Sequence, residues 1–341
     1  MKRLLLLCLT LLLALSCAIC AAEEPPADRP VGPAGERGER PDGAQRGEFG
    51  GNRGGGGSVD KSADETLQAM IAEVAPKFQL LTFADEETGA QLQYQLFIPE
   101  GYDASQRYPL VMFIPDSSAV GRGTDIVLSQ GWGGLIWAAP QEQARRPSFV
   151  LVPVFTETVV DDSFNHSAQI DVAVRLIESL LKTYSIDESR LYTTGQSMGG
   201  MTSFYLNIAY PDLFAASLFV GSQWDNSLLS VLEDKSFFYI VSAGDPKASA
   251  GQSELLAVFD ADGAAYAHGQ WSAQASAQEQ DDAVKALLAQ GQSANFVTFE
   301  LGTTLPEGTS AGAGGEHMTS FDYAYKLEAV RDWLFAQSKS E

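Results

Sequence analysis

The chain has 341 residues, of which 45% are hydrophobic, and its formal net charge is −22. That apolar content can build one large core, and α/β enzymes often use roughly 200–250 residues as a single domain. The strong negative charge repels nucleic acid and anionic lipid headgroups, which argues against a nucleic-acid partner, although solubility alone also explains it.

Residues 1–22 have the pattern of a signal peptide, with a basic start and an apolar run over 4–16 that is too short for a stable membrane anchor. We predict cleavage after Ala22 and export, to the periplasm or the medium, without a transmembrane anchor. An uncleaved anchor and a lipoprotein lipidated at Cys17 are the alternatives. Every cysteine lies in this segment, so the cleaved chain is expected to contain no disulfide.

Residues 23–61 are rich in glycine and proline and are predicted to be a disordered linker, because such a composition buries too little apolar surface to fold. Residues 62–341 have a globular composition and are predicted to form one domain. Its expected elements, in chain order, are a helix over 67–74, strands over 78–83, 91–99, 110–114 and 149–153, a helix over 170–184, a strand over 190–194, a helix over 198–210, strands over 216–220 and 237–242, a helix over 281–290, a strand over 296–301 and a helix over 323–337.

Two of these strands, 110–114 and 149–153, are continuous apolar runs, which are typical of strands buried on both faces of a parallel sheet. Strands and helices alternate through the rest of the domain. The predicted fold class is therefore α/β, with a mostly parallel central sheet and helices on both faces.

Residues 195–199 have the pattern G-x-S-x-G, which is the nucleophile elbow of the α/β-hydrolase fold when it joins a strand to a helix. The expected elements provide that context. The turn is so tight that larger side chains at Gly195 and Gly199 would collide with neighbouring backbone. Ser197 is therefore the candidate nucleophile, and the N–H of Met198, at the helix start, is a candidate donor to the oxyanion.

A serine hydroxyl becomes a good nucleophile only when a base takes its proton, and the chain has three histidines. His166 precedes Ser197, which is the wrong order for this fold. His268 and His317 both follow it. His317 is favoured because it stands after the last predicted strand, where the fold delivers its base.

The third catalytic group is a carboxylate that orients the imidazole. Asp245 is favoured because it follows the predicted strand 237–242, with Asp260 and Asp262 as alternatives. A second oxyanion donor is expected in the loop after strand 110–114, where the N–H of Ser117 is the candidate. The sequence indicates no metal site and no cofactor.

About residues 91–334 resemble a group of secreted bacterial α/β-hydrolases that includes predicted peptidases, phospholipase/carboxylesterase-like enzymes and polyhydroxybutyrate-depolymerase-like esterases. The segments that carry the resemblance are 192–201 (YTTGQSMGGM), 210–216 (YPDLFAA), 137–141 (WAAPQ), 149–153 (FVLVP) and 331–335 (RDWLF), together with His317. The resemblance implies a metal-independent Ser–Asp–His hydrolase with its triad on Ser197, Asp245 and His317.

The chain departs from this group in the oxyanion loop, where Pro115 and Asp116 replace the usual His-Gly. A carboxylate aimed at a developing oxyanion opposes it. We therefore expect Asp116 to turn outward or the oxyanion hole to be built differently, which bears on the role of Ser117 more than on the triad.

The predicted function is cleavage of a carboxylic ester, in a small molecule or an acylated polymer, through an acyl-enzyme. A serine peptidase using the same triad and a non-catalytic binding protein of this fold are the alternatives. Residues 250–280 are interpreted as an insertion that caps the active site, and Trp132, Trp137 and Trp224 as candidates to line its pocket. The oligomeric state is not predicted.

Overall fold

The computed structural model describes residues 60–305 and 315–339, all of which fall within one compact unit. The predicted signal peptide, its cysteines and almost the whole predicted linker lie outside these residues. Within the described part of the chain, no helix is both long enough and apolar enough to cross a membrane.

The described residues form a nine-stranded sheet with the order β1-β2-β4-β3-β5-β6-β7-β9-β8. Strand β2 runs antiparallel to both of its neighbours, and every other adjacent pair is parallel. The strands are β1 (Gln79–Ala84), β2 (Gln91–Phe97), β3 (Tyr108–Ile114), β4 (Phe149–Val154), β5 (Ile186–Gln196), β6 (Ala216–Val220), β7 (Phe237–Ser242), β8 (Ala267–Trp271) and β9 (Ala294–Phe299).

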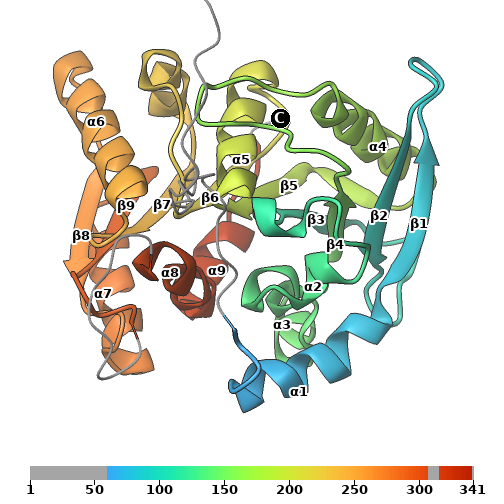
Figure 1. Ribbon diagram of the computed structural model, residues 1–341, viewed down its shortest axis with the longest axis horizontal. Helices are drawn as coiled ribbons and strands as arrows, with labels where there is room; N and C mark the ends of the chain where they lie inside the picture. Colours follow the sequence, from blue (N-terminus) through green and yellow to red (C-terminus); the bar gives the residue numbers. More distant parts are fainter. Residues whose placement is uncertain (1–59, 306–314, 340–341) are drawn as a thin grey trace, which may run out of the picture. The chain divides into compact units, whose positions relative to one another are not determined.

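Helices cover both faces of the sheet (Figure 1). The helices α4 (Gln169–Thr183), α5 (Met198–Ala209) and α6 (Pro246–Asp262) bury their apolar residues against one face. The helices α1 (Glu65–Val74), α7 (Ala277–Leu288), α8 (Gly315–Lys326) and α9 (Glu328–Phe335) cover the other face, with the short helices α2 (Ile126–Ser129) and α3 (Pro140–Arg145) nearby.

Strand β3 explains why a continuous apolar run marks the centre of this sheet. Leu110 and Met112 contribute to the core on one face, whereas Val111 and Phe113 contribute to the core on the other. Successive side chains of a strand point to opposite faces, so a strand covered on both sides needs apolar residues at every position. The predicted α/β fold class, with a mostly parallel sheet between two helical layers, is confirmed.

The structure corrects the expectation for residues 250–280. Instead of forming a cap, this segment continues helix α6, whose Leu255 and Phe259 are buried in the core, and then adds β8 to the edge of the sheet beside β9. Strand β8 was missed because it contains polar residues, as an edge strand that is half exposed can.

The prediction of one last helix over 323–337 is also wrong. The chain forms two helices there, which meet at Leu327, whose backbone is extended where α9 begins. The first of them, α8, begins eight residues before the expected start. His317 therefore lies in the first turn of a helix and not on a loop.

Candidate active site

Ser197 occupies the turn between β5 and α5 with φ of 52° and ψ of −120°. Such a backbone is strained for any residue other than glycine, and it persists only where the surroundings fix it. The N–H of Ser197 donates to the carbonyl oxygen of Val220 on the neighbouring strand β6, at 3.0 Å, and its carbonyl oxygen accepts from the N–H of Met201, at 2.9 Å. The sheet and the first turn of α5 thus hold the strained conformation in place.

Three glycines let the chain pass through this turn. A Cβ on Gly195 would lie 2.3 Å from the backbone of Gly199, and a Cβ on Gly199 would lie 1.9 Å from the carbonyl oxygen of Ile114 at the end of β3. A Cβ on Gly200 would lie 2.3 Å from Oγ of Ser222. The collision expected from the sequence is present, and the end of β3 packs directly on the turn.

His317, in the first turn of α8, lies between the other two predicted triad residues. Its Nε2 is 2.9 Å from Oγ of Ser197, and its Nδ1 is 2.5 Å from Oδ2 of Asp245. The edge-on ring of Phe321 packs against the imidazole, with ring centroids 5.0 Å apart. The structure therefore brings the hydroxyl, the imidazole and the carboxylate into one hydrogen-bonded series, although they are far apart in the sequence.

Asp245 is almost completely buried, and its two carboxylate oxygens have separate partners. It is the N-cap of α6, and its Oδ1 accepts from the backbone N–H groups of Lys247 and Ala248, each at 3.2 Å. Those donors and the positive end of the helix offset its negative charge. Oδ2 is left to face His317, so the cap fixes the orientation of the carboxylate toward the imidazole.

The alternative residues lie elsewhere. His268 is on the edge strand β8, where its Nε2 is 3.1 Å from Oγ1 of Thr298, and burial lowers its pKa. His166 stacks on the ring of a tyrosine in α5. Asp260 and Asp262 stand in the last turn of α6, roughly 20 Å along the helix from its N-cap.

The candidate oxyanion donors belong to two elements, the start of α5 and the loop that follows β3. Met198 is the first residue of α5, and the first N–H groups of a helix have no acceptor within that helix. Ser117 is exposed and begins a short 3-10 helix in the loop that follows β3. The contact between Gly199 and Ile114 brings the start of this loop against the elbow.

Asp116 does not turn outward, so the first of the two alternatives expected for it is wrong. It is 2% exposed, and its carboxylate accepts three hydrogen bonds, from Nε2 of Gln196 at 2.7 Å, from Nε2 of Gln130 at 2.9 Å and from the N–H of Ser118 at 2.8 Å. These neutral donors compensate for its burial. Because Gln196 directly precedes Ser197, Asp116 fastens the loop after β3 to the turn. A polar residue in the second position of the elbow was the available signal for this contact.

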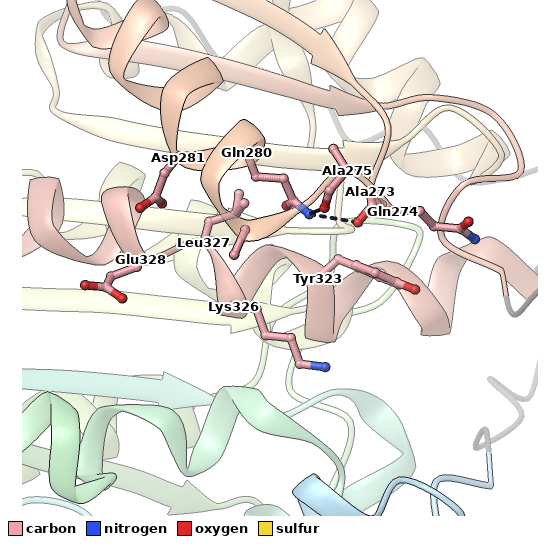
Figure 2. Close-up of a pocket in the computed structure, with 10 residues that line it drawn as sticks. Ala273, Gln274, Ala275, Gln280, Asp281, Tyr323, Lys326, Leu327 and Glu328 are labelled. Atoms are coloured by element: carbon pink, nitrogen blue, oxygen red, sulfur yellow. Dashed lines mark hydrogen bonds between the residues drawn. The ribbon is translucent and has the colours of Figure 1, made fainter.

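Two hollows are lined by residues within the described part of the chain. A cavity of about 320 Å³ lies between α7 and the junction of α8 and α9, with Gln280, Tyr323 and Lys326 among its lining residues (Figure 2). None of the three predicted triad residues lines it. A smaller hollow of about 230 Å³ has Phe164 and Lys247 among its lining residues, and none of the three triad residues lines it either. Its link to the hydrogen-bonded series is Lys247, whose N–H donates to Oδ1 of Asp245.

Only one of the three tryptophans expected at the pocket lines the smaller hollow. Trp224 does so, and it also contacts the ring of Phe164. Trp137 is fully buried between aromatic rings of α8 and α9, so it belongs to the core. Trp132 lies under the ammonium group of Lys326, 4.4 Å from the ring centroid. Within residues 60–305 and 315–339, no group of three potential ligands gathers to hold a metal ion.

Comparison with solved structures finds proteins that are similar to this chain in fold. A protein described as a thermostable esterase is 25% identical, with a TM-score of 0.62, over 78% of this chain and 64% of that chain. A feruloyl esterase module from Clostridium thermocellum, solved with sinapinate, is 13% identical over 74% and 88% of the two chains, with a TM-score of 0.46. A putative dipeptidyl aminopeptidase IV from Bacteroides ovatus is 13% identical over 75% and 35%, with the same TM-score.

No protein-family model matches the sequence, and no curated protein matches it. The strand–turn–helix at Ser197 is that of the α/β-hydrolase fold, and the mostly parallel sheet between helices is similar to that of the thermostable esterase. The chain therefore has this fold and is similar to the thermostable esterase, as the sequence resemblance predicts. It spans 64% of the length of the thermostable esterase.

Proposed function

We propose that this chain is a serine hydrolase that cleaves carboxylic esters through an acyl-enzyme. The observation that carries the proposal is the series from Oγ of Ser197 through the imidazole of His317 to the carboxylate of Asp245, with contacts of 2.9 and 2.5 Å at a strained turn. A nucleophile, a base and an orienting carboxylate in this order are what acyl transfer requires.

In the first half-reaction, Nε2 of His317 takes the proton of Ser197 while Oγ attacks the ester carbonyl carbon. Asp245 accepts the Nδ1–H hydrogen bond, which selects the tautomer with a free Nε2 and stabilises the imidazolium that forms. The imidazolium then gives its proton to the departing alkoxide. In the second half-reaction, His317 activates a water that releases the acid from Ser197.

The carbonyl oxygen gains negative charge at each attack and needs donors that are already oriented. We assign this role to the N–H groups of Met198 and Ser117. The position of Met198 at the start of α5 supports the first assignment, and the packing of β3 against the turn supports the second. Asp116 is compatible with both assignments, because its carboxylate accepts hydrogen bonds from three donors inside the protein.

The experiment compares Ser197→Ala with Ser253→Ala, a matched control on the exposed side of α6. Purified variants are assayed on a panel of acetyl, butyryl, feruloyl and glucuronoyl esters and on a peptide amide. We expect ester hydrolysis by the parent and the control, and a loss of about 10⁵-fold or more in Ser197→Ala. A fluorophosphonate probe should label only the two active proteins. Full activity in Ser197→Ala would refute the assignment, and amide cleavage without ester cleavage would make the enzyme a peptidase.

Export is a second part of the proposal, supported by the basic start and short apolar run of residues 1–22. The mature protein should begin after Ala22, which N-terminal sequencing of the secreted or periplasmic fraction measures. A lipoprotein would instead partition with membranes and lose that association in Cys17→Ser.

A further inference from the structure

Glu316 is a buried carboxylate that directly precedes His317, and the proposed reaction does not use it. It is 1% exposed, in the first turn of α8. Its Oε2 accepts hydrogen bonds from Oγ of Ser242 at 2.7 Å, from the N–H of Gly302 at 3.0 Å and from Oγ1 of Thr304 at 3.4 Å. All three donors are neutral. An ionisable group is costly to bury, so such a cluster requires a reason.

These hydrogen bonds connect three parts of the fold, namely α8, the end of β7 and the segment after β9. Ser242 ends β7, the strand that leads to Asp245, whereas Gly302 and Thr304 follow β9. The hydroxyl of Ser242 also accepts from the N–H of Gly244, at 3.3 Å, and so links Glu316 to the residue before Asp245. One carboxylate thus joins the start of the histidine-bearing helix to the strand end that carries the aspartate.

Gly244 shows how closely this carboxylate packs against the aspartate loop, by which we mean residues 243–245 after β7. A Cβ built on Gly244 would lie 1.8 Å from Oε1 of Glu316 and 2.0 Å from its Cδ. No side chain fits there while Glu316 keeps its position. The backbone φ of Gly244 is not left-handed, so close approach, and not conformation, requires the glycine.

We propose that Glu316 is a positioning residue that sets the hydrogen bond between Asp245 and His317 by clamping the two segments that carry them. This inference rests on the proposed function. The clamp acts through geometry, because His317 follows Glu316 and Asp245 follows Gly244, so a shift of the Glu316 carboxylate moves both partners of a 2.5 Å contact. Misplacement of a catalytic group by about 1 Å costs on the order of 100-fold in rate.

The first test compares Glu316→Ala with Glu316→Gln. The glutamine keeps a carbonyl oxygen that accepts from the three donors, whereas the alanine removes the clamp. We expect kcat to fall about 100-fold in Glu316→Ala with KM changed less than about threefold, and to fall less than about fivefold in Glu316→Gln. The far-downfield proton resonance of the His317 Nδ1–H should persist in Glu316→Gln and broaden or vanish in Glu316→Ala.

Gly244→Ala tests the clamp without altering the carboxylate. The added methyl displaces Glu316, so kcat should fall as in Glu316→Ala, and the double variant Gly244→Ala/Glu316→Ala should be no slower than Glu316→Ala alone, because the methyl then has room. Gly315→Ala is the matched control, since among residues 60–305 and 315–339 its Cβ would meet only the side chain of Leu305, at an ordinary 3.5 Å. If Glu316→Ala does not fold, Glu316→Gln and Gly244→Ala still decide the question.

A folded Glu316→Ala or Gly244→Ala variant with parental kcat and an unchanged downfield resonance overturns the clamp. So does a Glu316→Gln variant as slow as the alanine, because then the charge and not the geometry matters. These results leave Ser197→Ala inactive and the proposed function intact. If the parent hydrolyses no ester, the proposed function fails by itself, and the resonance still reports whether Glu316 positions His317.

Discussion

The two sides of the proposed site are built by different means. The serine side is one run of six residues, 195–200, in which three glycines approach the turn's own backbone, the end of β3 or Ser222 so closely that a Cβ would collide. The other side joins Asp245 to His317, which are 72 residues apart, through side-chain hydrogen bonds and the buried carboxylate of Glu316. The first side is held by steric contacts of the turn with itself, with β3 and with Ser222, and the second by hydrogen bonds between side chains of distant segments.

This difference has a consequence for how each side responds to change. Backbone atoms in close contact cannot move aside as a flexible side chain can, so a single added methyl group disturbs the serine turn. A hydrogen-bonded assembly can keep its geometry when one acceptor is replaced by another of the same shape. Substitutions therefore distinguish the two sides by what they tolerate.

The largest effect is expected from His317→Ala, which removes the base that links the two sides. We expect kcat on a short ester to fall about 10⁵-fold, because Ser197 loses its proton acceptor and the triad acts as a unit. His268→Ala, at the sheet edge, is the control and should keep parental kcat. If His268→Ala were the inactive variant instead, the role of catalytic base would have been assigned to the wrong histidine.

Asp245→Asn should follow, with a loss of about 10⁴-fold in kcat and little change in KM. The amide keeps an oxygen for the N–H groups of α6, but its NH₂ cannot accept from Nδ1 of His317, so the wrong tautomer is favoured. Asp260→Asn is the control, since Asp260 lies in the last turn of α6, far from His317, and accepts from the hydroxyl of Tyr266. Comparable kcat in Asp245→Asn and Asp260→Asn contradicts the role of Asp245.

Gly199→Ala tests the serine side by shape alone. The new Cβ would meet the carbonyl oxygen of Ile114 at 1.9 Å, so β3 and the turn must separate. We expect kcat to fall about 100-fold and the free energy of unfolding to fall by about 1–3 kcal/mol, measured by ester hydrolysis and urea denaturation. Parental values for both quantities would mean that the close approach is not needed.

The smallest effect on activity is expected from Asp85→Asn, remote from both sides. Arg175 of α4 donates to Asp85 at 2.8 and 2.7 Å, and these bonds lower the pKa of the carboxyl well below its ordinary value of 3.8. Stability from this pair is present above that ordinary value and is lost as pH falls through the folded-state pKa. Asp85→Asn should therefore lower Tm at pH 7 and 5, less so near pH 3, while kcat is unchanged. A Tm difference that does not shrink toward pH 3 contradicts the ion pair.

The sequence by itself was sufficient for what depends on neighbours along the chain. Alternating strands and helices with the buried run at 110–114 predict the parallel sheet, and 195–199 predicts a strand–turn–helix, because a tight turn restricts its own residues to glycine. Sequence order and fold resemblance also selected Asp245 and His317 as candidates. The sequence does not, however, predict the distance between their side chains, because they stand on segments far apart in the chain.

Only the tertiary structure decided which side chains meet across segments. It turned Asp116 inward onto Gln196, buried Trp137 in the core and placed Glu316 beneath the aspartate loop. Such contacts join residues far apart in the chain, and each depends on how whole helices pack on the sheet. The free energy of a buried carboxylate is set by donors that packing brings to it, which no local pattern of residues encodes.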